Sequence, residues 1–309
     1  MRLYLFFIVF TIAILNTSAQ VKKDTTVNVE GHLITLSTIV ISNKLNVPSF
    51  IDRIKNDTTF YKAFRNLHIL NYSAINDIRM VNKSGETQAS LRSKTKQIRT
   101  GNCRSMETIE EQTTGDIYDN NKKFNYYTGE LYAGLFFTKG SECGEDNIVK
   151  GRDFATADLS GMEKHKQQLK MLFFNPGKKI NGIPFIGSKT AIFDENMADK
   201  YDMSIDLEEH NKVSCYVFII KAKADKKSDV VIDEMTTWFN DKTFEIIARN
   251  YSLSYDASVY DFNVQMQVEM TKVGDLMVPA LLRYVGNWKA IFKKRERGIF
   301  TATLFDFKK

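Results

Sequence analysis

Histidine and the common catalytic sequence motifs are scarce in this chain of 309 residues. No GxSxG, GxGxxG or P-loop sequence is present, which argues against an α/β-type serine hydrolase and against a nucleotide-binding enzyme. The histidines show no metal-ligand spacing such as HExxH, which argues against a zinc hydrolase. There are four of them, His32, His68, His165 and His210.

Two short segments match catalytic patterns only formally. Ser93-Lys-Thr-Lys96 fits SxxK, but it lies in a polar strand-like segment, and no KTG or SDN sequence accompanies it. Asp206, Glu208 and Glu209 offer the pair of carboxylates that glycosidases use, although acidic residues at a strand end are usually just solvated. We therefore expect a protein that is not an enzyme and that holds no cofactor and no metal.

Long apolar runs are absent except at the N-terminus. Arg2 precedes an apolar run from Leu3 to Leu15, and small residues follow as far as Ala19. This is the plan of a secretory signal peptide cleaved before Gln20, because a membrane anchor, the alternative, needs roughly 20 apolar residues. No cysteine lies near the cleavage site to receive a lipid anchor. We expect residues 1–19 to be a signal peptide and the mature protein to be exported, to the periplasm or the extracellular space.

The net charge of the chain is small, and the chain contains only three cysteines. The formal charge is +6, or +5 once Arg2 is removed, which is too weak and scattered to indicate nucleic-acid binding but compatible with an anionic membrane surface. Cys103 and Cys143 lie in polar segments flanked by glycine, whereas Cys215 lies in an apolar strand. In an oxidising compartment this distribution favours a Cys103–Cys143 disulfide with Cys215 buried and free, and the alternative is three unpaired thiols.

The densest charge cluster lies in a predicted turn between two C-terminal strands. It consists of Lys289, Lys293, Lys294, Arg295 and Arg297. One interpretation is a solvated turn that prevents edge-to-edge pairing of strands. The other is a surface that contacts lipid headgroups or an acidic partner.

What the sequence does contain is strand-like alternation, which is clearest in residues 261–271. Apolar and polar residues alternate there without interruption, and in a strand this places all the apolar side chains on one face. That face is soft, because two of its five members are flexible methionines. The five are Phe262, Val264, Met266, Val268 and Met270.

The same period of two recurs through most of the chain. Strands are expected at 32–42, 78–81, 89–98, 106–117, 124–137, 201–207, 214–223, 230–240, 244–255, 260–272, 276–289 and 298–307. Residues 48–68 show helical spacing instead, interrupted at Asn56-Asp57. A second helix is expected to begin at the capping box Ser160-Gly-Met-Glu163 and to end at Asn175. Residues 20–30 are polar and are expected to form a flexible lead-in.

These elements predict an α+β fold that is mostly antiparallel, a curved half-barrel sheet with amphipathic helices covering its apolar face. We expect an N-terminal extension with one strand at 20–45 and a single half-barrel domain at 46–309. If the helices form a loose lid, the apolar face becomes a hydrophobic cavity. Its candidate ligand-binding residues are Trp238, Phe244, Tyr251, Phe262, Val264, Met266, Val268, Met270, Met277 and Trp288.

Three stretches of the C-terminal part carry a family resemblance: CYVFIIKAK, VVIDEMTTWFNDKTFEIIARNYSLSY and FNVQMQVEMTKVGDLMVPALLRY, the last with a strand that ends at Leu276-Met-Val-Pro279. Over residues 200–309 the chain resembles the periplasmic lipoprotein-carrier family, LolA-like with its LppX-like relatives. The resemblance implies one sheet wrapped around helices, with a cavity for acyl chains.

The function predicted is that of an exported, non-catalytic envelope protein that binds lipid or lipoprotein acyl chains in a hydrophobic cavity, in the manner of a carrier. The expected partners are those acyl chains and a membrane surface or envelope protein, and not nucleic acid. One alternative is a structural or protein-interaction module with a closed core. The other is an outer-membrane β-barrel, against which the two amphipathic helices argue.

Overall fold

The computed structural model describes residues 25–29, 32–39, 45–149, 171–180, 186–256, 260–290 and 294–309. The predicted signal peptide, His165, Lys293 and the predicted capping box at Ser160 lie outside the described residues.

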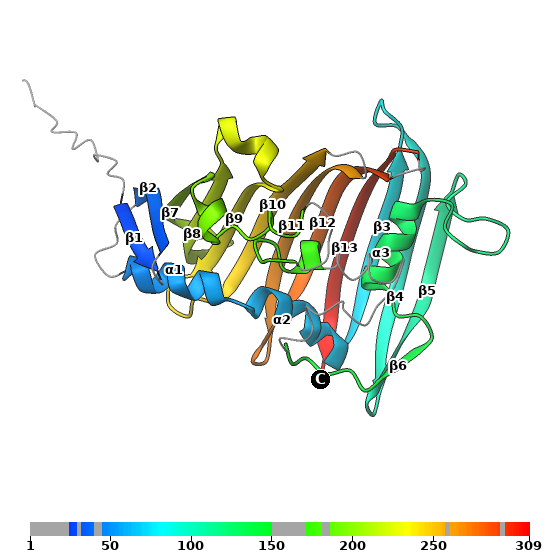
Figure 1. Cartoon of the computed structure of the whole chain (residues 1–309). Helices are drawn as coiled ribbons and strands as arrows, with labels where there is room; N and C mark the ends of the chain where they lie inside the picture. The colour runs from blue at the N-terminus through cyan, green and yellow to red at the C-terminus, as the bar shows by residue number, and fades with distance from the viewer. Residues whose placement is uncertain are drawn as a thin grey trace, which may run out of the picture.

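One curved, open sheet contains the described strands (Figure 1), which confirms the predicted α+β half-barrel. Its order is β1-β2-β7-β8-β9-β10-β11-β12-β13-β3-β4-β5-β6, with antiparallel pairing everywhere except between β2 and β7. The strands are β1 (Thr25–Val29), β2 (His32–Ile39), β3 (Asn71–Val81), β4 (Thr87–Thr100), β5 (Cys103–Thr114), β6 (Ser141–Cys143), β7 (Tyr201–His210), β8 (Val213–Ala222), β9 (Ile232–Asn240), β10 (Ile246–Asp256), β11 (Tyr260–Val273), β12 (Leu276–Ala290) and β13 (Glu296–Lys308).

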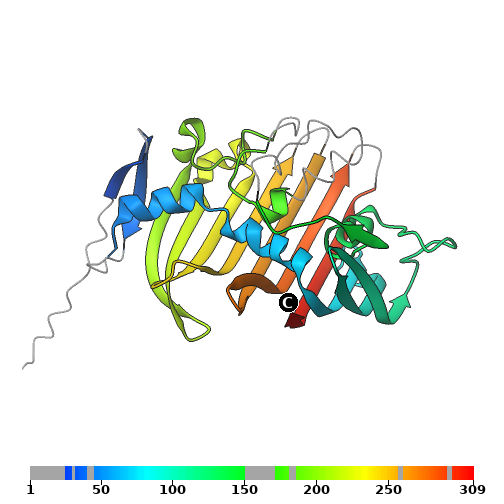
Figure 2. The same cartoon turned by 90° about the horizontal axis from the view of Figure 1, so that it is seen from below.

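Helices cover one face of this sheet, which we call the inner face. Figure 2 shows α1 (Val47–Asn56) and α2 (Thr59–Asn66) running across it. As predicted, the helical segment is interrupted near Asp57, whose carboxylate accepts hydrogen bonds from the backbone N–H and the hydroxyl of Thr59 at 3.2 and 2.6 Å. The other helical elements are η1 (Leu67–Ile69), α3 (Tyr127–Phe136), α5 (Glu195–Ala198) and η3 (Ala224–Asp229).

Strand β11 lies near the middle of the sheet, between β10 and β12. Its alternation is expressed as predicted: Phe262, Val264, Met266 and Val268 are buried on the inner face, whereas the intervening Asn263, Gln265 and Gln267 are exposed on the outer face. The apolar face of β11 is therefore part of a continuous core beneath the helices.

The segment 124–137 was predicted as a strand, and this prediction is wrong, because residues 127–136 form helix α3. Two tertiary contacts explain the difference. The carboxylate of Glu296, on β13, accepts hydrogen bonds from the N–H groups of Tyr127 and Thr128 at 3.0 and 2.7 Å, which satisfies the helix N-terminus. Tyr132 stacks on Phe300 with 5.2 Å between ring centroids, which anchors the helix to the sheet.

The N-terminal extension also differs from expectation. It contains two strands where one was expected, because residues 25–29 of the predicted lead-in form β1. β1 pairs antiparallel with β2, and β2 pairs with β7, so the extension continues the sheet at one end.

Candidate functional site

A cavity of about 340 Å³ lies between α2, α3 and the strands β3, β4 and β13. This volume is within the range of roughly 300 to 1,000 Å³ that small-molecule sites occupy. The lining residues are Tyr61, Phe64, Arg65, Leu67, His68, Tyr72, Ala74, Asn76, Gln97, Arg104, Gly134, Leu135, Phe136, Phe137, Glu142, Glu145, Met171, Phe174, Ala302 and Leu304.

One part of the cavity wall is aromatic and aliphatic. Phe174 stacks on Phe64 of α2 with 4.2 Å between ring centroids, and its edge meets Phe136 of α3 at 5.8 Å. Phe136 in turn stacks on Phe300 of β13 at 4.8 Å. Helices α2 and α3 thus meet the sheet through one cluster of rings.

Another part of the wall is polar, and Arg104 of β5 lies at its centre. The guanidinium donates hydrogen bonds to the carboxylates of Glu142 and Glu145, to the hydroxyl of Thr138, and to Oε1 of Gln97 at 3.3 Å. Gln97 is almost fully buried, and its Nε2 donates to the carbonyls of Leu67 and Leu70, both at 2.7 Å. A half-buried arginine and a buried glutamine are tolerated here because each has partners.

Glu142 and Glu145 belong to residues 139–149, which we call the strap. The strap is tied to α2, since Arg65 donates to the carbonyl of Asp146 at 2.8 Å and Asn147 donates to the side chain of Asn66 at 2.8 Å. His68, 3.2 Å from Glu145, and then Arg104 hold the pKa of the Glu145 carboxyl well below its usual range, against the opposing effect of burial.

The strap is also tied covalently to the sheet. Cys103 of β5 and Cys143 of β6 form a disulfide, the pairing that the sequence favoured, and Cys215 is buried and free. The N–H of Gly144 donates to the carbonyl of Asn102 at 3.0 Å. One end of the cavity is thereby closed by a segment that is bonded to both β5 and α2.

The inner face changes character at β3 and β4. Asn76 is buried there, and its Nδ2 donates to the hydroxyls of Ser93 and Thr95 at 3.3 and 3.1 Å. In the same region burial raises the pKa of Tyr72 to about 12, so its hydroxyl stays protonated at neutral pH. The cavity therefore lies at a boundary between the mainly apolar inner face of β7–β13 and a polar patch that consists of Asn76, Ser93, Thr95, Gln97 and Arg104.

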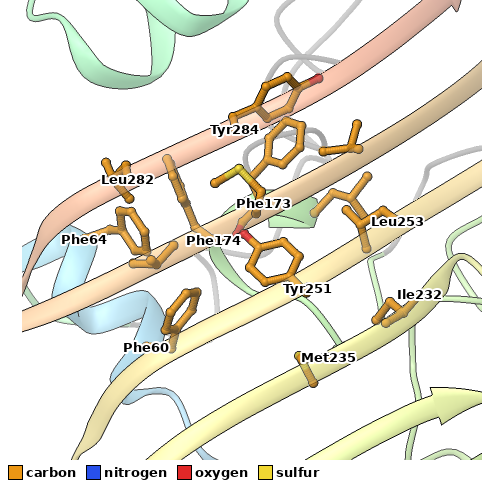
Figure 3. Packing of buried hydrophobic residues seen from close by; sticks show 14 of the residues in the cluster. Phe60, Phe64, Phe173, Phe174, Ile232, Met235, Tyr251, Leu253, Leu282 and Tyr284 are labelled. Carbon is orange, nitrogen blue, oxygen red and sulfur yellow. Dashed lines mark hydrogen bonds between the residues drawn. The ribbon is translucent and has the colours of Figure 1, made fainter. Parts of the chain in front are cut away.

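Most of the predicted ligand-binding residues gather in the core beside the cavity, not in its wall. Phe173 packs against Tyr284 and Trp288, with centroid distances of 5.7 and 6.1 Å, and Tyr251 donates a hydrogen bond to the Phe173 carbonyl. Figure 3 shows Phe173 and Phe174 lying over the strands that carry Tyr251, Leu282 and Tyr284. The predicted residues buried in this core are Tyr251, Phe262, Val264, Met266, Val268 and Trp288.

The four remaining predicted residues lie elsewhere. Trp238 is on the outer face, where its ring lies 4.9 Å from that of His210, because the buried members of β9 are Ile232, Met235, Thr237 and Phe239. Its predicted place on the inner face is therefore wrong. Phe244 packs on Phe50 of α1 at 5.9 Å, and Met270 and Met277 are half-buried.

Only part of the predicted basic cluster is available to contact a partner. Arg295 donates to Asp261 and to Asn287, so its charge is compensated within the chain. Lys289 and Lys294 are exposed and Arg297 is half-buried. The surface that remains for a partner is smaller than the sequence indicated.

Sequence reasoning missed Arg104, Gln97, Asn76 and the carboxylates of the strap. The available signal was the unusual polarity of the predicted strand 89–98. Among the described residues, no group of three His, Cys, Asp or Glu side chains is arranged to hold a metal ion. No described helix has the length and apolar character needed to cross a membrane.

Comparisons with known proteins gave matches only among solved structures. No protein-family model matches the chain, and no curated protein matches its sequence. A DUF1329 family protein from Desulfovibrio piger is 11% identical with a TM-score of 0.25, and the alignment covers 81% of this chain and 93% of that one. A domain described as an outer membrane lipoprotein-sorting protein, from Vibrio parahaemolyticus, is 9% identical with a TM-score of 0.26, covering 79% and 88%.

The second of these descriptions names the same class of protein as the resemblance found in the sequence.

Proposed function

We propose that this chain is an exported, non-catalytic envelope protein that binds acyl chains of a lipid or lipoprotein, with residues 46–309 acting as one binding domain. The observation that carries the proposal is the two-sided cavity. Phe64, Phe136 and Phe174 offer a surface for hydrocarbon, and Gln97 and Arg104 lie at a polar end. An amphiphile with an apolar chain and a polar head matches this division.

An acyl chain gains about 0.8 kcal/mol for each CH₂ group that it buries. Phe174 lines the cavity and Phe173, its neighbour, covers Tyr284 and Trp288 in the core. Displacement of these two side chains by a ligand joins the cavity to the inner face of β10–β12, where the predicted residues Tyr251, Phe262 and Met266 lie.

Lipid extraction of the purified mature protein, followed by mass spectrometry, tests this proposal directly, together with displacement of a fluorescent fatty acid. Leu135 lines the cavity and is half-buried, so Leu135→Arg places a charge in the acyl path with limited damage to the core. Leu207→Arg is the matched control, because Leu207 is 42% exposed on β7.

We expect Leu135→Arg to weaken fatty-acid binding at least tenfold and Leu207→Arg to leave it unchanged. Absence of any co-purifying acyl ligand, together with no displaceable binding of the fluorescent probe, contradicts the proposal.

A second candidate function is a protein-interaction module with a permanently closed core. The observation in its favour is the burial of Phe173, which is 1% exposed and fills the space over β10–β12. Met266→Arg separates the two candidates. Met266 is 3% exposed, so a permanently packed core predicts global unfolding, whereas an acyl-binding face predicts a folded protein that no longer binds.

A further inference from the structure

Strand β5 has a long free edge. β4 pairs with it along its whole length, from Cys103 to Thr114, whereas β6 pairs only with Cys103, Arg104 and Ser105. Within the described part of the chain, no strand pairs with the other side of residues 106–114. All side chains from Glu107 to Thr114 are exposed. Every second backbone N–H and C=O along this stretch consequently faces away from β4.

An exposed edge of this length is a template for strand addition, and proteins usually protect such edges. The protection here is incomplete. A bulge in the β4–β5 ladder leaves Ile109 as the extra residue, between the pairs Thr95↔Thr108 and Lys94↔Glu110. Ile109 is 51% exposed, so the edge presents an apolar side chain as well as free backbone groups.

The charges on this edge select among possible occupants. Glu107, Glu110 and Glu111 lie on the edge strand, and on its β4 side Lys96 is opposite Glu107 and Lys94 is opposite Glu110. The ammonium group of Lys122 lies 4.0 Å from the Glu111 carboxylate. A new strand on the free side thus meets the carboxylates of Glu107 and Glu110 directly and the lysines of β4 only at the distance of a second strand, whereas Glu111 already lies beside Lys122.

A second copy of this chain is a poor occupant. Antiparallel pairing of two copies centred on Ile109 sets Glu107 of each copy opposite Glu111 of the other, and pairing centred on Glu110 sets that residue opposite itself. Like charges directly opposite are destabilising in a sheet. A segment with lysine or arginine at these positions has the opposite effect.

We propose that the free edge of β5, residues 106–114, is a docking site for an extended basic segment of a partner protein, which adds to the sheet as a further strand. The partner is defined by its chemistry, alternating cationic residues in a segment without proline. The site is separate from the cavity and does not depend on the acyl-binding proposal.

The test uses the full mature protein and a ten-residue probe in which lysine and threonine alternate, with blocked ends and a fluorescent label. The control probe has glutamate in place of lysine. Binding is measured by fluorescence anisotropy, and hydrogen–deuterium exchange with mass spectrometry locates the protected amides. The edge variant is E107K/E110K/E111K. The matched control variant is E208K/E209K/E234K, since these three carboxylates are also exposed and the change in net charge is the same.

We expect the lysine probe to slow exchange in residues 106–114 and the glutamate probe not to do so. The edge variant should bind the lysine probe at least about tenfold more weakly, whereas the control variant should change the affinity less than about threefold. Three results overturn the proposal: equal weakening in both variants, binding without protection of 106–114, or slow exchange of this edge in the free protein at every concentration, which means that it is already covered.

Discussion

The hydroxyl of Tyr251 donates a hydrogen bond to the backbone carbonyl of Phe173. Tyr251 belongs to β10 at the centre of the sheet, whereas Phe173 belongs to a segment that lies over the inner face. Burial raises the pKa of the Tyr251 hydroxyl far above its usual range, so it remains a donor at any physiological pH. This bond attaches the aromatic residues that fill the core to the strand beneath them.

Tyr251→Phe should loosen that attachment. The variant leaves a buried carbonyl without this donor, which costs about 1 to 3 kcal/mol of unfolding free energy. Since Phe173 then moves away from the sheet more easily, we expect tighter binding of a fluorescent fatty acid. Urea unfolding and probe titration measure the two effects.

Tyr284→Phe is the control for this variant. Its hydroxyl accepts a hydrogen bond from Trp288 Nε1 and is equally buried. We expect Tyr284→Phe to lose a similar amount of stability without a gain in affinity for the probe. An equal gain in affinity in both variants means that the hydrogen bond from Tyr251 to Phe173 does not control ligand entry.

Phe174→Ala should enlarge the cavity. Phe174 lies between Phe64 and Phe136, and removal of its ring costs about 3 to 5 kcal/mol of stability, as for other buried phenylalanines. The new volume adjoins the existing cavity, so longer fatty acids should bind more tightly than to the wild type. Titration with probes of increasing chain length measures this.

Phe239→Ala is the matched comparison, because Phe239 is buried but does not line the cavity. It should lose comparable stability and show no change in chain-length preference. The same preference in both variants argues that cavity volume does not limit the ligand.

Removal of the disulfide should destabilise the whole protein. Cys103 and Cys143 are 40 residues apart in sequence, and closing a loop of that size stabilises a folded chain by about 2 to 4 kcal/mol through the entropy of the unfolded state. The double variant C103S/C143S should therefore unfold at lower urea concentration. Dithiothreitol should lower the wild-type midpoint to that of the variant and leave the variant itself unchanged; a further shift in the variant is incompatible with this assignment.

Arg104→Met should release the strap. The variant leaves Glu142 and Glu145 without their shared cation, and both are partly solvated, so a loss of about 1 to 3 kcal/mol at pH 7 is expected. The pKa of Glu145 is lower in the folded protein than in the unfolded chain. Its contribution to stability is thus complete above about pH 4.3 and declines as the pH falls further.

This linkage predicts that the difference in stability between the wild type and Arg104→Met is largest near neutral pH and shrinks below about pH 4. Part of the lowering survives in the variant, because His68 remains beside Glu145. Urea unfolding measured from pH 7 to pH 3 provides the comparison. A difference that is constant over this range shows that Arg104 acts by packing and not by charge.

Strands of the C-terminal half followed directly from the sequence. In β11 each apolar residue from Phe262 to Val268 is buried and each intervening polar residue is exposed. Once one face of the sheet is covered, only one register places all the apolar side chains of an alternating strand on that face. The interrupted helical segment 47–66 could equally be predicted from the sequence, because its apolar spacing and the hydrogen bonds from Thr59 to Asp57 are both local.

The parts of the fold and of the site that could not be predicted from the sequence depend on contacts between residues far apart in the chain. Helix α3 contains aromatic residues that favour a strand by propensity, and it is fixed by Glu296, 169 residues from Tyr127 in sequence. The polar part of the cavity wall could not be predicted from the sequence for a similar reason. Gln97 points inward because it bonds to carbonyls at the end of α2, and no periodicity records such a partner.

The order of the strands places the end of the chain next to its first long antiparallel strand, with Gly298 opposite Met80 and Phe305 opposite Ser73. Ala302 and Leu304 of β13 line the same cavity as Tyr72 and Ala74 of β3. A nascent chain consequently lacks a wall of this cavity until β13 has been synthesised. A ligand that needs this cavity can therefore bind only after β13 has paired with β3, and contacts between strands so far apart in sequence form slowly.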